Sequence, residues 1–196
     1  NSCVLQVSVL CKKIFAYFLV AQLFLSMFHI SVFATSKLTW KINDSVLTIS
    51  GQDYMDNYGG PSQYNKTAPW YDYRWQITKI VIEKGVKSIG FSAFKEFSNV
   101  SEVIIADSVV QIGSDAFYGC KKLENIDIPN SVTVLGGGVF TNCTSLTEIF
   151  IPNSISNIGT MSFIACTNLT SVIIENDSAL KYIGDYAFKG CTNLKH

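Results

Sequence analysis

The chain has 196 residues, with 15 lysine and arginine residues against 15 aspartate and glutamate residues; 48% of its residues are hydrophobic and 15% are charged. A disordered chain combines low hydrophobicity with high charge, so this composition excludes disorder over most of the length. The balance of charge also argues against nucleic acid as a partner, because a phosphate-binding surface needs an excess of lysine and arginine.

The N-terminal segment 1–34 has the pattern of an export signal. Residues 14–33 are nearly all apolar, Lys12 and Lys13 stand just before them, and small residues mark a cleavage point after Ala34. A basic flank, an apolar run and a small-residue site are typical of a secretory signal peptide. The run is also long enough for an uncleaved membrane anchor, and a buried core helix is the third interpretation. The segment is the only predicted membrane contact.

Residues 35–76 are predicted to form an N-terminal β cap with an aromatic loop. Within residues 38–50, apolar and polar positions alternate around Asn43-Asp44, which predicts a β-hairpin. The rings of three tryptophans either seal the first repeat or form a platform that binds sugars. Buried rings would support the first interpretation, and exposed rings the second. All three tryptophans of the chain lie in this region: Trp40, Trp70 and Trp75.

Residues 77–196 contain about five leucine-rich repeats with a period of 23 residues, or 25 at the last step. An aliphatic residue followed by glycine occurs once in each repeat: Ile89-Gly90, Ile112-Gly113, Leu135-Gly136, Ile158-Gly159 and Ile183-Gly184. A phenylalanine follows each glycine at a fixed distance: Phe94, Phe117, Phe140, Phe163 and Phe188. A short, mostly β-branched run precedes each of these motifs: Ile80-Val81-Ile82, Val103-Ile104-Ile105, Ile126-Asp127-Ile128, Ile149-Phe150-Ile151 and Val172-Ile173-Ile174.

The spacing within each repeat predicts its local structure. The alternating run predicts a short strand, and the I-G-x-x-A-F-x-x-C-x-x-L stretch has the rhythm of a helix or a series of turns. One repeat cannot bury its apolar side alone, so neighbouring repeats stack and share a core. The predicted fold class is therefore an α/β repeat: a leucine-rich-repeat solenoid with a parallel strand ladder on its concave side and an N-terminal β-hairpin cap.

The two ends of the sequence favour a piece of a longer protein. The first residue is Asn1 rather than methionine, and the last repeat stops at His196, before its next strand. Solenoids need polar capping repeats at their ends, and none follows here. We therefore expect the natural chain to continue.

The repeat motif resembles the BspA-like leucine-rich-repeat proteins, a repeat type known from treponemal surface proteins. The segments TWKINDSVLTISG and APWYDYRWQITKIVIEKGVKSIG are similar to the stretch that opens many bacterial members, so the resemblance covers residues 38–196. It implies a secreted or surface-displayed protein, and several members are implicated in attachment to host proteins or other cells. The chain departs from the pattern at Gly136-Gly137-Gly138 and in the longer loop at Glu175–Tyr182.

We predict that the chain is not an enzyme and has no metal or cofactor site. The two histidines are His29, in the predicted leader, and His196, the last residue, so a Ser–His–Asp or Cys–His arrangement has no base to use. There is also no C-x-x-C motif to supply a zinc site. Spacing alone does not exclude a pair of glycosidase carboxylates, but the repeat carboxylates are most simply interpreted as solvated surface. They are Asp107, Asp115, Glu124, Asp127 and Glu148.

The repeat cysteines occupy equivalent positions and are expected to stack roughly 5 Å apart. That distance permits a disulfide in an exported protein. Phe97 fills the same position in the first repeat, and a position that accepts phenylalanine is a core position. Buried free thiols are therefore favoured over a disulfide or a metal site. The cysteines are Cys120, Cys143, Cys166 and Cys191.

The middle residue of each predicted strand points to the concave surface. This column contains Val81, Ile104, Asp127, Phe150 and Ile173. Polar neighbours on the same face are Glu102, Asn125, Glu148 and Ser171. An exposed apolar stripe with a polar rim is typical of an interaction surface, although β-branched residues also suit a parallel ladder for structural reasons.

The sequence therefore predicts a secreted or cell-surface binding module that acts in adhesion or protein–protein interaction. Its partner is expected to be a protein or glycan on a host or neighbouring cell, bound at this column and its polar neighbours. Two alternatives remain open. One is a non-catalytic targeting or carbohydrate-binding region of a larger exported enzyme, and the other is an architectural surface spacer.

Overall fold

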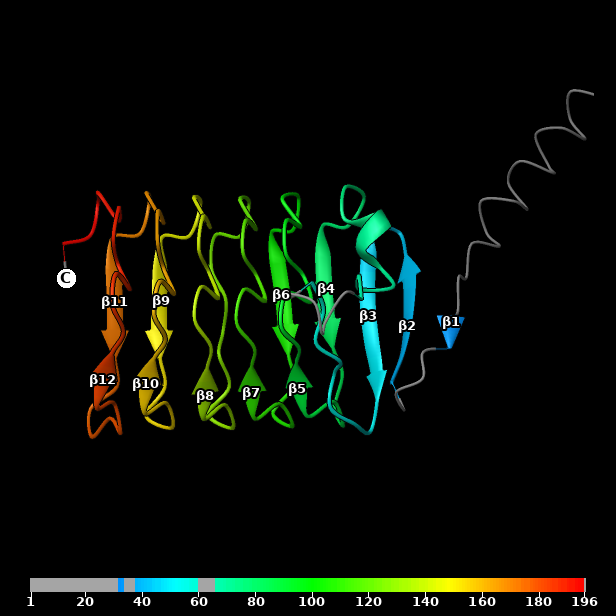
Figure 1. Ribbon diagram of the computed structural model, residues 1–196, viewed down its shortest axis with the longest axis horizontal. Helices are drawn as coiled ribbons and strands as arrows, with labels where there is room; N and C mark the ends of the chain where they lie inside the picture. The colour runs from blue at the N-terminus through cyan, green and yellow to red at the C-terminus, as the bar shows by residue number, and fades with distance from the viewer. Residues whose placement is uncertain (1–31, 34–37, 60–65, 196) are drawn as a thin grey trace, which may run out of the picture. The chain divides into compact units, whose positions relative to one another are not determined.

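The computed structural model describes residues 32–33, 38–59 and 66–195, so the predicted leader lies almost entirely outside the described residues. Over residues 77–195 the chain winds as a parallel β-solenoid, with five successive coils that each contribute one short strand (Figure 1). This arrangement confirms the predicted repeat solenoid. Among the described residues, no helix is both long enough and apolar enough to cross a membrane.

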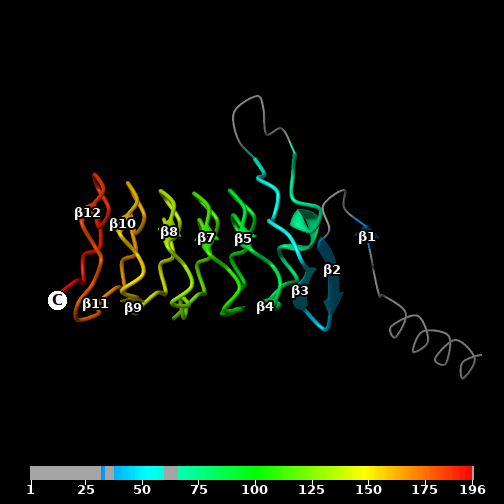
Figure 2. The same cartoon turned by 90° about the horizontal axis from the view of Figure 1, so that it is seen from below.

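Two parallel ladders run along different sides of the coils, as Figure 2 shows. The long-strand ladder contains β4 (Lys79–Ile82), β6 (Glu102–Ile105), β9 (Glu148–Ile151) and β11 (Ser171–Ile174). The short-strand ladder contains β5 (Ser88–Ile89), β7 (Gln111–Ile112), β8 (Val134–Leu135), β10 (Asn157–Ile158) and β12 (Tyr182–Ile183). The register follows the sequence period: Lys79 pairs with Glu102, and Asn157 pairs with Tyr182 after the longer loop.

A β-hairpin precedes the first coil, as predicted. It consists of β2 (Leu38–Asn43) and β3 (Val46–Gly51), and β3 pairs in parallel with β4. The two turn residues between the strands, Asp44 and Ser45, both have positive φ, which is the geometry that matches the twist of a two-residue hairpin. A short strand, β1 (Val32–Phe33), pairs antiparallel with β2, and a single 3-10 turn, η1 (Tyr71–Tyr73), leads towards β4.

The segment after each short strand is a series of turns, and no α-helix occurs among the residues that the structure describes. Two columns of residues in these segments have positive φ, a conformation that interrupts a right-handed helix. The first column contains Ser92, Asp115, Gly138, Met161 and Tyr186. The Phe94 N–H donates to Ala116 O at 2.9 Å, and the Phe117 N–H donates to Val139 O at 3.0 Å. These donors bind the next coil, so they are not available for helical hydrogen bonds.

The core is built around a stack of aromatic rings that runs along the solenoid. The five repeat phenylalanines stack with ring centroids 5.1 to 5.8 Å apart and interplanar angles of 4° to 23°. Trp70 continues the stack, because its ring lies 5.7 Å from that of Phe94. Aromatic pairs of this kind contribute about 1 kcal/mol each beyond the burial of their area.

The glycine that follows the aliphatic residue in each repeat lies where neighbouring coils approach closely. A Cβ atom on Gly113 would lie 2.7 Å from the Phe91 nitrogen, and one on Gly159 would lie 2.5 Å from the Gly136 oxygen. Both contacts are with backbone atoms, which cannot rotate away as a flexible side chain can. The I-G motif is therefore a requirement of coil spacing.

The long-strand ladder is interrupted at the third repeat, where the predicted strand Ile126-Asp127-Ile128 is wrong. Residues 125–128 form no strand and make no backbone hydrogen bond with another described residue. Two prolines explain this difference: Pro129 follows the third segment, and Pro152 follows β9. At other coils the residue after the strand closes the ladder, as where the Ala106 N–H donates to Ile82 O at 3.1 Å.

Proline has no N–H group, so this closing bond cannot form at Pro129 or Pro152. The two missing bonds would have reached Ile105 O and Ile128 O. The third segment therefore lacks this bond on both sides, whereas the Glu175 N–H again donates to Ile151 O at 3.3 Å.

Replacement of Gly113 by alanine is expected to destabilise the protein by about 3 kcal/mol, because the added methyl group overpacks the contact with the preceding coil. Gly119→Ala is the matched control. The nearest atom to its added Cβ lies at 3.6 Å, so only the positive φ of 72° opposes it, at a cost of about 1 kcal/mol. Urea unfolding measures both, and an equal or smaller effect at Gly113 would contradict the close-approach explanation.

Replacement of Pro129 by alanine is expected to supply the missing donor and create a hydrogen bond to Ile105 O. The bond contributes about 1 kcal/mol, which the greater flexibility of the unfolded chain largely offsets, so stability changes little. Amide hydrogen exchange provides the measurement: the new amide at position 129 should be as protected as that of Ala106. Exchange at the rate of a solvated amide would show that proline is not the cause of the interruption.

Candidate binding face on the long strands

All nine residues predicted to bind a partner lie on the long strands or on the equivalent segment of the third repeat. They are Val81, Glu102, Ile104, Asn125, Asp127, Glu148, Phe150, Ser171 and Ile173. The register pairs Val81 with Ile104 and Phe150 with Ile173, so these side chains are neighbours across the ladder. The interruption separates the two pairs, and Asp127 lies between them in sequence. We call this surface the long-strand face.

Three of the five central residues of the long-strand face are exposed although they are large and apolar, whereas Val81 is half-buried. Ile104 is 44% exposed, Phe150 is 42% exposed and Ile173 is 40% exposed. Their neighbours along the strands, such as Val103 and Ile149, are buried, because successive side chains of a strand point to opposite faces. The face therefore presents a row of apolar side chains to solvent.

Carboxylates dominate the charge of the long-strand face. Glu102 is compensated by Lys79, whose ammonium nitrogen lies 2.7 Å from a Glu102 oxygen. Asp127 and Glu148 are both exposed, and neither forms an ion pair with a described residue. The face is therefore acidic around its apolar row.

A groove of about 310 Å³ lies on this face, between the second and third coils. It is lined by Val103, Ile104, Ile105, Asp107, Asp127, Ile128 and Pro129. Asp107, predicted from the sequence to be solvated surface, lines the same groove as Asp127, which the sequence did not indicate. Pro129 could have indicated an interruption of the ladder at this place, because it ends the third segment and removes the hydrogen bond that would close the ladder there.

The aromatic residues of the hairpin and the loop after it form a packed cluster. Trp40 and Trp70 are buried, with their ring centroids 6.3 Å apart, and the Trp70 indole N–H donates to Ala93 O at 2.8 Å. These two rings seal the first coil, which favours the structural interpretation over a sugar platform. Trp75 differs, because it is 56% exposed and the Arg74 guanidinium lies 4.5 Å from its ring centroid.

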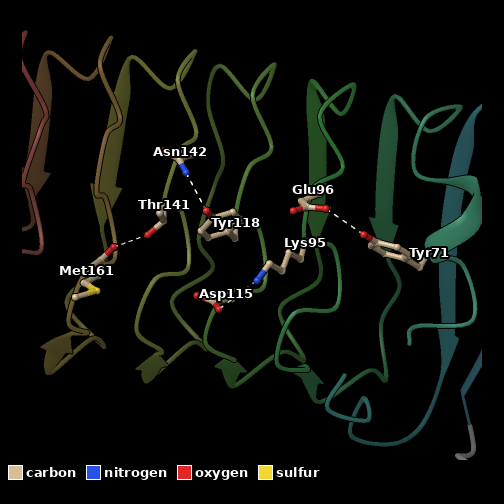
Figure 3. Close-up of polar contacts among 8 residues, drawn as sticks. All are labelled: Tyr71, Lys95, Glu96, Asp115, Tyr118, Thr141, Asn142 and Met161. Carbon is tan, nitrogen blue, oxygen red and sulfur yellow. Dashed lines mark hydrogen bonds and ion pairs between the residues drawn. The ribbon is translucent and has the colours of Figure 1, made fainter. Parts of the chain in front are cut away.

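The turn segments carry polar contacts that join one coil to the next or to the η1 turn (Figure 3). The Tyr71 hydroxyl donates to Glu96 at 3.0 Å, and Lys95 lies 3.9 Å from an Asp115 oxygen. Partial burial raises the pKa of the Asp115 carboxyl, and Lys95 opposes that shift. Similar contacts join Asn142 to the Tyr118 hydroxyl and Thr141 to Met161 O. Each contact joins a single pair of residues and holds neighbouring segments together.

The repeat cysteines lie along the core as thiols. Cys120, Cys143 and Cys166 are buried, and Cys191 is partly exposed. Each Sγ lies near the backbone oxygen of a repeat phenylalanine, as where Cys143 donates to Phe117 O at 3.2 Å. Burial raises the pKa of Cys120 well above its usual value and that of Cys143 to about 12. Among the described residues, no three potential metal ligands lie together.

Alkylation of the folded protein is expected to distinguish these cysteines. At about pH 8.5 an exposed thiol is half ionised, whereas buried thiols with raised pKa values stay protonated and react slowly. Iodoacetamide should therefore modify Cys191 well before Cys120 and Cys143, as measured by peptide mass mapping over time. The control is the unfolded chain in guanidinium, in which all of them should react at similar rates. Equal rates in the folded protein would contradict the burial of the thiols.

The comparisons with known proteins agree with this geometry. The family described as "BspA type Leucine rich repeat region" matches residues 69–195, in six copies. No curated protein matches the chain.

Solved structures of bacterial leucine-rich repeat proteins share the fold. A leucine-rich repeat protein from Eubacterium ventriosum is 26% identical, with a TM-score of 0.69 over 85% of this chain. The leucine-rich repeat protein of T. pallidum is 23% identical, with a TM-score of 0.55 over 83% of this chain. A leucine-rich cell surface protein from Faecalibacterium prausnitzii is 22% identical, with a TM-score of 0.57 over 85% of this chain. The alignments span 42%, 90% and 53% of these three proteins, respectively.

Proposed function

Because the chain belongs to the BspA-type leucine-rich repeat family, we propose that it is a surface-displayed or secreted binding module that mediates adhesion through its long-strand face. Recognition is non-covalent and uses side chains presented by successive coils. The partner is a protein or a glycan of a host or neighbouring cell.

The exposed apolar row is the observation that carries this proposal. Exposed apolar side chains that group on a surface and have a polar rim are typical of an interaction site. Here Ile104, Phe150 and Ile173 repeat at the same register position of three strands. Solenoids commonly present such strand faces to their partners, since each coil adds one more contact position.

The acidic rim supports the same surface. Interfaces combine an apolar centre, which supplies most of the affinity, with a polar rim that sets orientation. Exposed Asn125, Asp127 and Glu148 supply polar groups beside the apolar row. The similarity to a structure described as a cell surface protein, from Faecalibacterium prausnitzii, supports a location at the surface.

Replacement of Phe150 and Ile173 together by aspartate is expected to weaken adhesion. Both residues are exposed on the long-strand face, so the change removes apolar contacts without opening the core. Beads coated with the full chain are assayed on cultured epithelial monolayers and on bacterial biofilms, and the variant should lower adherence roughly tenfold, which corresponds to about 1.4 kcal/mol.

Met161→Asp is the matched control, because Met161 is 44% exposed but lies in a turn segment after β10. Its adherence should equal that of the original protein, and circular dichroism should show that all three proteins are folded. Unchanged adherence of the double variant would contradict the proposed face and favour an architectural spacer. Absence of adherence of the original protein to both surfaces would contradict adhesion itself.

A further inference from the structure

We propose that the groove between the second and third coils binds the side chain of a lysine or arginine from an extended segment of a partner protein. This inference rests on the proposed binding function and specifies its chemistry. The groove is lined by Val103, Ile104, Ile105, Asp107, Asp127, Ile128 and Pro129. We call it the coil 2–3 groove.

The walls of the coil 2–3 groove suit the stem of a long side chain. Ile104 and Ile105 come from β6, and Ile128 and Pro129 come from the third coil. The methylene groups of lysine and arginine bury along apolar surface while the charged group stays near water. A volume of about 310 Å³ lies at the lower end of the range for ligand sites, which suits one or two side chains.

Two carboxylates in the same groove suit the charged end of that side chain. Asp107 follows β6, and Asp127 belongs to the third coil, so one carboxylate comes from each wall. Both are exposed, and neither makes a hydrogen bond or an ion pair with any residue that the structure describes. Some carboxylates elsewhere are compensated within the chain, as Glu102 is by Lys79 and Asp56 is by Lys66. An incoming cation is the partner that this pair lacks.

The surroundings favour an extended peptide as the carrier of the cation. Residues 125–128 form no strand and make no backbone hydrogen bond with another described residue, so the groove lies where the ladder is interrupted. An extended segment that lies across the face points alternate side chains towards it, and a pocket that accepts one of these side chains provides specificity. Glu148, which forms no ion pair with a described residue, adds a further exposed carboxylate to this face.

The exposure of the two carboxylates also distinguishes this groove from the active site of a glycosidase. Hydrolysis of a glycoside needs one carboxyl group that burial keeps protonated near neutral pH. Asp107 and Asp127 are both exposed to solvent. The groove therefore lacks the buried carboxyl group that a glycosidase site requires.

Selection from a random peptide library tests the inference on the full chain. Peptides of 12 residues that bind the immobilised protein are sequenced, and the tightest are measured by fluorescence polarisation. We expect lysine and arginine to be enriched, and replacement of the critical lysine by norleucine, which keeps the stem and loses the charge, to weaken binding about tenfold. Affinity should also fall as salt increases, because salt screens exposed ion pairs.

Paired variants of the protein identify the groove. Asp107→Asn together with Asp127→Asn should weaken the selected peptides about tenfold. Asp177→Asn together with Asp185→Asn is the matched control, since both residues are exposed carboxylates of the last coil, and it should leave affinity unchanged. Thermal melting followed by circular dichroism establishes that both pairs of variants are folded.

Three results would overturn the inference: no peptide selected, no enrichment of lysine or arginine, or equal affinity in the Asp107/Asp127 variant. If the selected peptides lack cationic residues but lose binding when Phe150 and Ile173 are changed to aspartate, the long-strand face remains a binding surface and only the cation specificity is wrong. Binding of a glycan array without any peptide binding would likewise contradict the inference and leave the adhesion proposal intact.

Discussion

Backbone hydrogen bonds between neighbouring coils set a spacing that every other part of the structure must accommodate. The bonds come from the long-strand ladder, the short-strand ladder and the turn segments, where the Phe94 N–H reaches Ala116 O. The spacing leaves no room for a side chain after the aliphatic residue of each repeat, so glycine is required there. It also matches the distance at which flat rings stack, so one phenylalanine from each coil fills the core continuously. A serine hydroxyl adds to the bonds between coils, as where Ser131 donates to Val109 O at 2.7 Å.

The turn segments show how strongly this spacing overrides local preference. The motif has apolar residues three and four apart, a pattern that suits a helix. A helix, however, would direct its N–H groups along its own axis and leave the coils unconnected on that side. The chain instead places residues such as Asp115 and Met161 at positive φ, which costs energy for residues with a side chain. The hydrogen bonds to the next coil compensate for that cost.

The sequence allowed the solenoid, the register and the core to be predicted because all three follow from the repeat period. The inward alternation along β6 and β9 and the outward position of Phe150 followed from the two-residue period of a strand. The turns and the positive φ values were not predictable from apolar spacing, since that spacing is the same for turns and helix. The third segment was mispredicted as a strand because Ile126-Asp127-Ile128 resembles its neighbours in pattern, and the difference lies in two prolines outside the run.

Those prolines connect the regularity of the fold to the binding that we propose for the long-strand face. A perfectly repeated surface presents the same contact at each coil and therefore distinguishes poorly between partners. Pro129 and Pro152 remove hydrogen bonds from both sides of the third segment, and Asp127 occupies the position at which other coils carry valine, isoleucine or phenylalanine. The coil that departs most from the ladder thus also carries the unpaired carboxylate at the centre of the face. In the proposed binding role, affinity comes from the repeated apolar row and specificity from the one coil that breaks the repetition.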